Sequence, residues 1–188
     1  MPRLAGGKPC RGAICLFRHR LARPPFWVHL AAMSSPAPTI APVDPDAPEA
    51  RACLSAYLAL LRDRIPGITA AHVPDPDPEA GSYRPPKGAF LLAREGGRAV
   101  ACVALKPVDA ATGEVKRLWV AEEARGRGLA RAMMAAVEAE ARRLGLARLR
   151  LDTNESLPEA IALYRRLGWS EIAPFTPFPA THWFAKDL

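Results

Sequence analysis

Apolar residues recur at helical spacing in two segments of the chain, and a capping pattern marks the start of a third helical segment. In the first segment Leu54 and Leu58 fall on one face, as expected for a helix that packs on a core. Gly145 follows the second segment, at the position where helices commonly end. Ser156 and Glu159 have the spacing of a capping box at the start of the third. The pattern predicts helices over residues 47–64, 129–144 and 158–168.

Apolar runs of β type fill the intervals between the predicted helices. Two of them are joined by Glu-Gly-Gly at 95–97, which is typical of a hairpin turn. Residues 66–88 hold six prolines and predict a surface loop of the kind that shapes substrate pockets. The element order predicts an α/β (α+β) fold, a mixed sheet flanked by helices. The predicted strands are 39–43, 89–94, 98–106, 114–120, 147–153, 169–173 and 182–187.

The start of the chain differs from the rest in charge. Six Lys and Arg residues and no acidic residue precede Asp44, so this part holds +6 of the formal net charge of +7. The rest of the chain is nearly neutral, which removes the main argument for a nucleic-acid or membrane partner. We expect residues 1–37 to be a disordered leader, a targeting segment, or the result of a start assigned upstream of Met33. Residues 38–188 are expected to form one domain.

Two classes of protein are excluded by composition. Arg, Glu or Pro interrupts every apolar run well short of the roughly 18 to 20 residues that a membrane-spanning helix needs. Four cysteines at irregular spacing form neither a disulfide framework nor a zinc site. We therefore expect no membrane segment, no metal, reduced thiols and a cytoplasmic location.

The turn Arg125-Gly126-Arg127-Gly128 joins a predicted strand directly to a helix. Glycines let the backbone approach a ligand, and the N–H groups at a helix start point toward anionic oxygens. Arginines would add charge-assisted hydrogen bonds. The turn therefore suggests a phosphate or pyrophosphate ligand, although an ordinary loop with surface arginines has the same composition. The glycine spacings of the Walker and dinucleotide motifs are missing.

Two motifs in the right order resemble those of one family. Arg125, Gly128 and Ala130, in the spacing Arg-x-x-Gly-x-Ala after Leu-Trp-Val at 118–120, resemble the acyl-CoA site of the GNAT superfamily of N-acyltransferases. The segment Ala-Ile-Ala-Leu-Tyr-Arg-Arg-Leu-Gly-Trp at 160–169 is similar to the second motif of that superfamily. The resemblance covers the predicted domain without the leader. It implies a GNAT-like, mostly antiparallel, splayed sheet flanked by helices.

The same resemblance implies acetyl-CoA as the co-substrate. The backbone of the strand that ends at residues 118–120 would hydrogen-bond the pantetheine arm, and the glycine turn would hold the pyrophosphate. The cofactor-binding residues that it implies are Leu118, Trp119, Val120, Arg125, Gly126, Arg127, Gly128, Leu129 and Ala130.

The resemblance also implies two catalytic roles, because an amine attacks the thioester and a thiolate leaves. Glu114 matches the strand carboxylate that is the base in some relatives, and its spacing from Val120 predicts one shared strand face. It could instead be a solvated carboxylate paired with Lys116, with water as the base. Tyr164 matches the tyrosine that protonates the sulfur, although a tyrosine packed with its hydroxyl at the surface fits as well. Many relatives carry asparagine where this chain has Leu157.

The sequence thus predicts an N-acetyltransferase that transfers an acetyl (acyl) group from acetyl-CoA to an amine by direct transfer in a ternary complex. A non-catalytic acyl-CoA sensor or partner-binding module would carry the same motifs. The acceptor amine is not identified, because acceptor choice in the superfamily lies in variable segments such as 65–88 and 174–181. Lys116 and Arg117 are expected on opposite strand faces, so only one could bind a substrate carboxylate. The strands after Tyr164 could pair in a homodimer.

Overall fold

Seven strands form one sheet in the computed structural model, which describes residues 37–72 and 74–188. Their order is β1-β2-β3-β4-β5-β7-β6, and every neighbouring pair is antiparallel except β4 and β5. This confirms the predicted mixed, mostly antiparallel sheet. Apart from Ala37, the predicted leader lies outside the described residues. The strands are β1 (Thr39–Pro42), β2 (Ala89–Glu95), β3 (Arg98–Pro107), β4 (Thr112–Val120), β5 (Arg148–Thr153), β6 (Ser170–Glu171) and β7 (His182–Asp187).

Three α-helices accompany these strands in the described part of the chain, each within two residues of its predicted ends. Gly145 follows the second helix with a φ of 79°, as its role in ending the helix requires. The predicted capping box is wrong, because Leu157 occupies the N-cap without a capping side chain. Glu159 pairs with Arg64 instead. The helices are α1 (Pro48–Arg64), α2 (Leu129–Arg143) and α3 (Pro158–Arg166).

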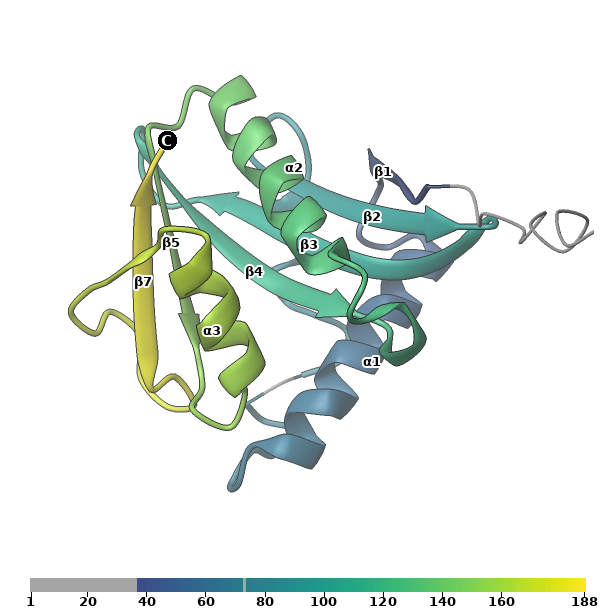
Figure 1. Ribbon diagram of the computed structural model, residues 1–188, viewed down its shortest axis with the longest axis horizontal. Coiled ribbons are helices and arrows are strands. Elements are labelled where there is room, and N and C mark those ends of the chain that lie inside the picture. Colours follow the sequence, from purple (N-terminus) through teal and green to yellow (C-terminus); the bar gives the residue numbers. More distant parts are fainter. Residues whose placement is uncertain (1–36, 73) are drawn as a thin grey trace, which may run out of the picture. The chain divides into compact units, whose positions relative to one another are not determined.

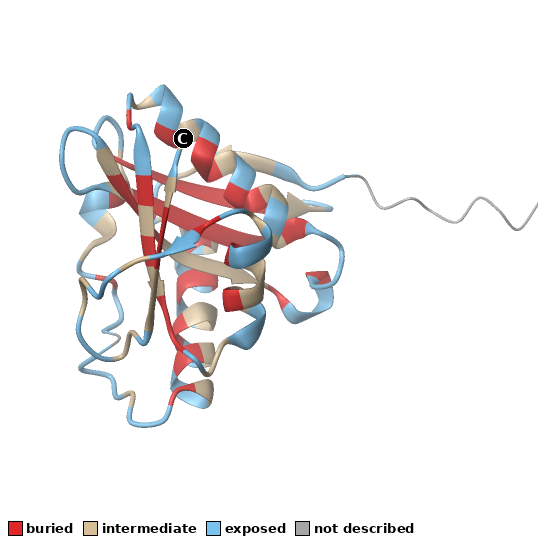
Figure 2. Ribbon diagram, turned by 60° about the vertical axis from the view of Figure 1, so that its left-hand side comes forward, coloured by how far each residue is buried: buried red, intermediate tan, exposed pale blue. Residues whose placement is uncertain are grey.

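The helices divide between the two faces of the sheet. In Figure 1, α2 and α3 lie in front of the sheet and α1 lies behind it. Met133 and Val137 of α2 and Ile161 of α3 belong to the larger core cluster, with buried residues of β2 to β5. Leu54 of α1 belongs to a second cluster with Phe90 and other residues of β2 and β3. The central strands are therefore buried along most of their length, as the red bands of Figure 2 show.

β4 and β5 pair over only part of their length. Residues 112–114 lie opposite 148–150, and no further pairs follow between these strands. Beyond Glu114, β4 continues to Val120 beside β3, while β5 continues to Thr153 beside β7. Figure 1 shows the two strands diverging, with α3 in front of the gap. The sheet is splayed as expected, and the second half of β4 has a strand neighbour on one side only.

A β-bulge interrupts β4 at Arg117, whose φ of 58° is the one positive value among the described non-glycine residues. The register with β3 shifts by one residue there, so side-chain alternation reverses across the bulge. Glu114 and Val120 therefore lie on opposite faces, and the predicted shared face is wrong. Arg117 also turns to the face of Lys116, since both side chains lie near Tyr57 of α1. The prediction of opposite faces for this pair is wrong for the same reason.

The proline-rich segment 66–88 is packed more deeply than a surface loop. It contains a short 3-10 helix, Ala80–Tyr83, and the Tyr83 side chain is fully buried in the cluster beneath α1. A buried tyrosine ring contributes a large apolar area, which anchors the segment to the sheet. The prediction of a surface loop is thus correct for the two ends of the segment and wrong for the short helix that carries Tyr83.

Candidate functional site

A cleft of about 550 Å³ opens where β4 and β5 diverge. Its walls come from the end of β4, the glycine turn, the first turn of α2, one face of α3, and Tyr57 and Leu60 of α1. Among the nine predicted cofactor-binding residues only Arg127 does not line it. The eight that do are Leu118, Trp119, Val120, Arg125, Gly126, Gly128, Leu129 and Ala130.

The open edge of β4 presents backbone groups to this cleft. Residues 118–120 pair with no strand other than β3, because β5 has already turned away. An extended ligand with amide groups can hydrogen-bond such an edge as an added strand would. At the end of the strand the Val120 carbonyl accepts a hydrogen bond from Arg125 Nε at 3.1 Å. The edge therefore offers its peptide groups to a ligand, and Arg125 closes it.

Two glycines shape the turn between β4 and α2. The φ angles of Gly126 and Gly128 are 75° and 80°, values that L side chains rarely adopt. Apart from chain neighbours, no heavy atom lies within 4 Å of where a Cβ would stand at either residue. The helix that begins at Leu129 directs its first N–H groups, which have no partner within the helix, out of its start. With Arg125 and Arg131 lining the same cleft, this end attracts anions.

Arg127 points away from the cleft. Its Nη1 and Nη2 donate to both carboxylate oxygens of Glu95 at 3.0 and 2.7 Å, which ties the turn to the β2–β3 hairpin. Arg131 lines the cleft in its place and was not among the predicted residues. It follows the motif in the first turn of α2, so helical spacing could have identified it.

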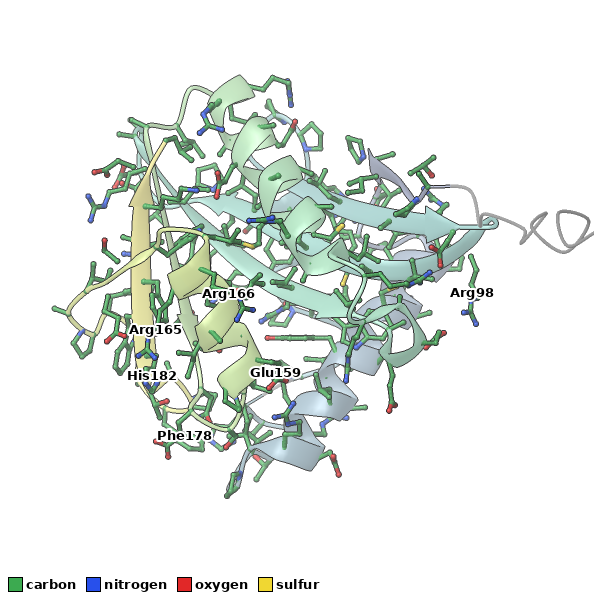
Figure 3. The ribbon with its side chains drawn as sticks, in the orientation of Figure 1. Arg98, Glu159, Arg165, Arg166, Phe178 and His182 are labelled. Carbon is green, nitrogen blue, oxygen red and sulfur yellow. The ribbon has the colours of Figure 1, made fainter. Side chains whose placement is uncertain are left out.

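The opposite wall of the cleft is mostly apolar and comes from α3 and α1. Arg64 of α1 pairs with Glu159 and donates to the Ser156 carbonyl at 2.6 Å, which fixes α1 beside the start of α3. Figure 3 shows Glu159 and Arg166 on α3. This wall was not predicted from the sequence, although several of its members recur at helical spacing. They are Tyr57, Leu60, Leu157, Glu159, Ala160, Leu163, Arg166 and Leu167.

Tyr164 is buried at the inner side of α3. Its ring packs on Trp169 and Phe184, with centroids 6.1 and 5.6 Å away, and the residue is 6% exposed. Burial raises the pKa of the phenol well above its ordinary value, and the nearby Tyr57 and Asp152 raise it further. The phenol therefore keeps its proton at neutral pH and can act as a donor. It lies close to Tyr57, which lines the cleft.

Glu114 is a buried carboxylate held between two cations. Lys116 Nζ lies 2.9 Å from Oε1, and Arg150 Nε donates to Oε2 at 2.9 Å. Burial alone would raise the pKa of Glu114, but Lys116 and Arg150 outweigh it and lower the pKa. The predicted pairing with Lys116 is confirmed, whereas the alternative of a solvated carboxylate is wrong, since 4% of the side chain is exposed. Glu114 does not line the cleft.

Arg117 fastens the proline-rich segment to β4. Its Nε donates to Asp77 Oδ2 at 2.6 Å, and its Nη2 lies 3.5 Å from Glu79 Oε2. Burial would raise the pKa of Asp77, but the hydrogen bond and charge of Arg117 outweigh it and lower the pKa. Arg117 is therefore engaged by the protein itself and is not a free cation for a substrate carboxylate.

The two variable segments predicted to choose the acceptor meet in the structure. His72 of the first contacts Phe178 of the second edge to face, with ring centroids 5.1 Å apart. Phe175 of the second segment covers the Arg150 guanidinium, at 4.1 Å from the ring centroid. Both segments thus reach the charged groups on the α1 side of the gap.

No helix in residues 37–72 and 74–188 combines the length and apolar character needed to cross a membrane. The same residues contain no group of three or more His, Cys, Asp or Glu side chains placed to hold a metal ion. The expected absence of a metal stays a prediction.

Residues 55–169 match the Acetyltransferase (GNAT) family. A curated relative, the IAA acetyltransferase of Azospirillum brasilense, is 40% identical over 90 residues, which are 47% of this chain and 59% of the relative. The chain thus matches less than two thirds of that relative. Among solved structures, an acetyltransferase from Streptococcus agalactiae aligns with a TM-score of 0.69 and 22% identity, over 80% of this chain and 98% of that chain.

A second solved structure carries a ligand. It is a GNAT family acetyltransferase from Elizabethkingia anophelis with acetyl-CoA bound, which aligns with a TM-score of 0.58 and 19% identity. The alignment covers 80% of this chain and 98% of that chain. At these identities the two structures establish a common fold.

Proposed function

The chain belongs to the acetyltransferase (GNAT) family, and from that premise we propose that it transfers an acetyl group from acetyl-CoA to an amine. The family and fold predicted from the two motifs are confirmed, as is the classification as an acyltransferase enzyme. One observation above all supports acetyl-CoA as the donor. The open edge of β4 and the turn with two left-handed glycines meet in one cleft.

The residues of this cleft fit the chemistry of coenzyme A. The peptide groups of 118–120 can hold the amides of a pantetheine arm, as an added strand would be held. Gly126 and Gly128 leave room for a pyrophosphate beside the first N–H groups of α2 and the Arg125 side chain. A relative of the same fold binds acetyl-CoA, which supports this assignment. Acetyl-CoA supplies the acetyl group as a thioester.

The acceptor approaches the gap from the side of α1 while acetyl-CoA occupies the cleft, so both substrates are held in one ternary complex. The amine nitrogen attacks the thioester carbonyl, and a C–N bond forms as the C–S bond breaks. Tyr164 donates its phenolic proton to the departing sulfur, since its burial keeps the phenol protonated at neutral pH until the sulfur leaves. The proton lost by the nitrogen passes to water, and water returns a proton to Tyr164.

The predicted role of Glu114 as the base is not supported by its surroundings. A base must take up a proton, yet the two cations on Glu114 stabilise its ionised form. We therefore propose that water removes the proton and that Glu114 holds Lys116 and Arg150 in place. Glu114→Gln tests this. It should weaken folding but lower turnover less than about tenfold, whereas loss of a general base costs about 100-fold or more.

Release of free thiol from acetyl-CoA tests the proposed function. The full chain is assayed with amines, amino acids, aminoglycosides and N-terminal peptides as acceptors. We expect acceptor-dependent release with at least one class. Calorimetric binding of acetyl-CoA without release for any acceptor would favour the alternative of a sensor or binding module. Neither binding nor release would contradict both.

A further inference from the structure

Two cysteine thiols meet beneath α1, and neither residue lines the cleft. Cys53 lies on the buried face of α1 and Cys102 lies on β3. Both thiols are free, and both residues belong to the same apolar cluster. A hydrogen bond joins the two side chains, so their sulfurs are neighbours. Two neighbouring thiols on different elements can join α1 to the sheet as a disulfide when one of them is oxidised.

A second cavity, of about 360 Å³, gives access to Cys53. Its lining comes from α1, from the turn between β2 and β3 with the start of β3, and from Trp119 of β4. Arg98 also lines this cavity, and 68% of its side chain is exposed, so the cavity reaches solvent. Only 3% of Cys53 is exposed, yet the cavity has more space than a water-sized molecule needs. A small oxidant such as hydrogen peroxide can therefore reach the sulfur of Cys53.

The two thiols differ in acidity. The neighbouring Cys102 thiol lowers the pKa of Cys53 and outweighs the effect of burial, whereas burial raises the pKa of Cys102 well above its ordinary value. The thiolate is the nucleophilic form of cysteine. Cys53, which also lines the second cavity, is therefore the thiol that reacts first, and Cys102 is the thiol that then reacts with the oxidised sulfur.

Cys102 connects this pair to the cleft through the β-bulge of β4. Its Sγ donates a hydrogen bond to the Arg117 carbonyl oxygen at 3.3 Å, and Cys102 pairs with Trp119 across the β3–β4 ladder. Trp119 lines both the second cavity and the cleft. If Cys102 bonds to Cys53, its sulfur loses the proton that it donates to Arg117. The bulge then loses this hydrogen bond directly before residues 118–120, whose peptide groups form the open edge of β4.

We propose that Cys53 and Cys102 form a redox-active pair that hydrogen peroxide converts to a disulfide, and that this disulfide weakens acetyl-CoA binding. The Cys53 thiolate attacks one peroxide oxygen, so an S–O bond forms, the O–O bond breaks and hydroxide leaves. The Cys102 sulfur then attacks the Cys53 sulfur, an S–S bond forms and the S–O bond breaks. The Cys102 proton and one proton from solvent convert the two hydroxides to water. The effect on acetyl-CoA rests on the proposed function, whereas disulfide formation does not.

The test uses the full chain with Cys10→Ser and Cys15→Ser, which leaves Cys53 and Cys102 as its two cysteines. After treatment with hydrogen peroxide, peptide mapping by mass spectrometry should find Cys53 and Cys102 joined, and dithiothreitol should separate them. Calorimetric titration should show acetyl-CoA affinity about tenfold lower in the oxidised chain, within the usual range of coupling between two sites. Reduction should restore the affinity.

Cys53→Ser in the same background is the matched control. It prevents the disulfide and leaves the bond from Cys102 to Arg117 in place, so peroxide should not change its acetyl-CoA affinity. Unjoined cysteines after peroxide, or an equal loss of affinity in Cys53→Ser, would overturn the inference. A disulfide that leaves acetyl-CoA affinity unchanged would also overturn it. A disulfide in a chain that binds no acetyl-CoA even when reduced would support the thiol pair and contradict the proposed function.

Discussion

The two sides of the gap between β4 and β5 differ in the chemical groups that they present. On the side of α2 and α3, the cleft offers backbone edges, positive-φ glycines and an apolar wall. On the side of α1, ion pairs join residues far apart in the chain, such as Arg117 and Asp77, which are 40 positions apart. The first side can bind a ligand common to many proteins through the main chain. The second side presents side chains, so it can differ between relatives without disturbing the first.

The largest effect is expected from a variant that disrupts acetyl-CoA binding on the first side alone. Gly128→Glu should weaken acetyl-CoA binding more than about 100-fold, because a carboxylate would stand beside the pyrophosphate and like charges repel by several kcal/mol. Calorimetric titration measures the loss. Gly145→Glu is the matched control, because it has a φ of 79°, open space and the same substitution at the far end of α2. It should keep full affinity, and equal losses in both variants would contradict the assignment of the turn.

The next-largest effect is expected on turnover, from a variant at the place where the two sides meet. Tyr164→Phe should lower turnover about 100-fold through loss of a general acid. Acetyl-CoA affinity should be unchanged, because the backbone and the turn are intact. Steady-state kinetics with calorimetry separates the two. Tyr83→Phe removes a buried hydroxyl from the anchored segment and should keep turnover nearly unchanged. An undiminished rate in Tyr164→Phe would remove Tyr164 from the mechanism.

A third variant loosens the second side alone. Asp77→Asn removes the charge that Arg117 faces and should lower the free energy of unfolding by about 3 kcal/mol at neutral pH, as for a broken buried pair. The pKa of Asp77 is lower in the folded protein than in the unfolded chain. Its stabilising effect is therefore full above the unfolded pKa, about 4, and is lost as the pH falls through the folded pKa.

Urea unfolding at several pH values measures this effect. The difference in stability between the unaltered chain and Asp77→Asn should shrink as the pH falls below about 4. Glu171→Gln, which breaks an exposed pair with Arg165, is the control and should change stability little at any pH. A difference independent of pH would show that the Asp77 charge does not act through Arg117.

The smallest effect distinguishes two arginines of one turn. Arg125→Ala should weaken acetyl-CoA binding about tenfold, since it removes a charged hydrogen-bond donor from the cleft. Arg127→Ala should change affinity less than about twofold, because Arg127 does not line the cleft and its guanidinium is held by Glu95. Equal losses of acetyl-CoA affinity in the two variants, measured by calorimetry, would show that Arg127 also belongs to the binding site.

Local sequence was sufficient for the helices and strands and for the turn between β4 and α2, but not for the apolar wall that α3 and α1 add to the cleft. Some features depend only on residues a few positions apart, so they can be predicted from the sequence alone. They are the helix and strand periods, the Glu-Gly-Gly turn and the turn around Gly128. The splay was expected only through the family resemblance. The residue that decides the side of Glu114 is Arg117, and no signal in a strand-like run predicts a bulge there.

The second side could not be read in the same way. Arg117 and Asp152 lie far apart in the chain, and only the folded sheet brings both near Tyr57. The deep anchor at Tyr83 was hidden by the prolines around it. The leader, the cytoplasmic location, the homodimer and the absence of nucleic-acid and membrane partners stay predictions.

Amide hydrogen exchange can show whether acetyl-CoA binds along the backbone of the first side. Saturating acetyl-CoA should slow exchange at residues 118–120 and 128–131, which line the cleft. Exchange at residues 74–83, on the second side, should change little. Protection confined to residues 74–83, or no protection at saturation, would contradict the account.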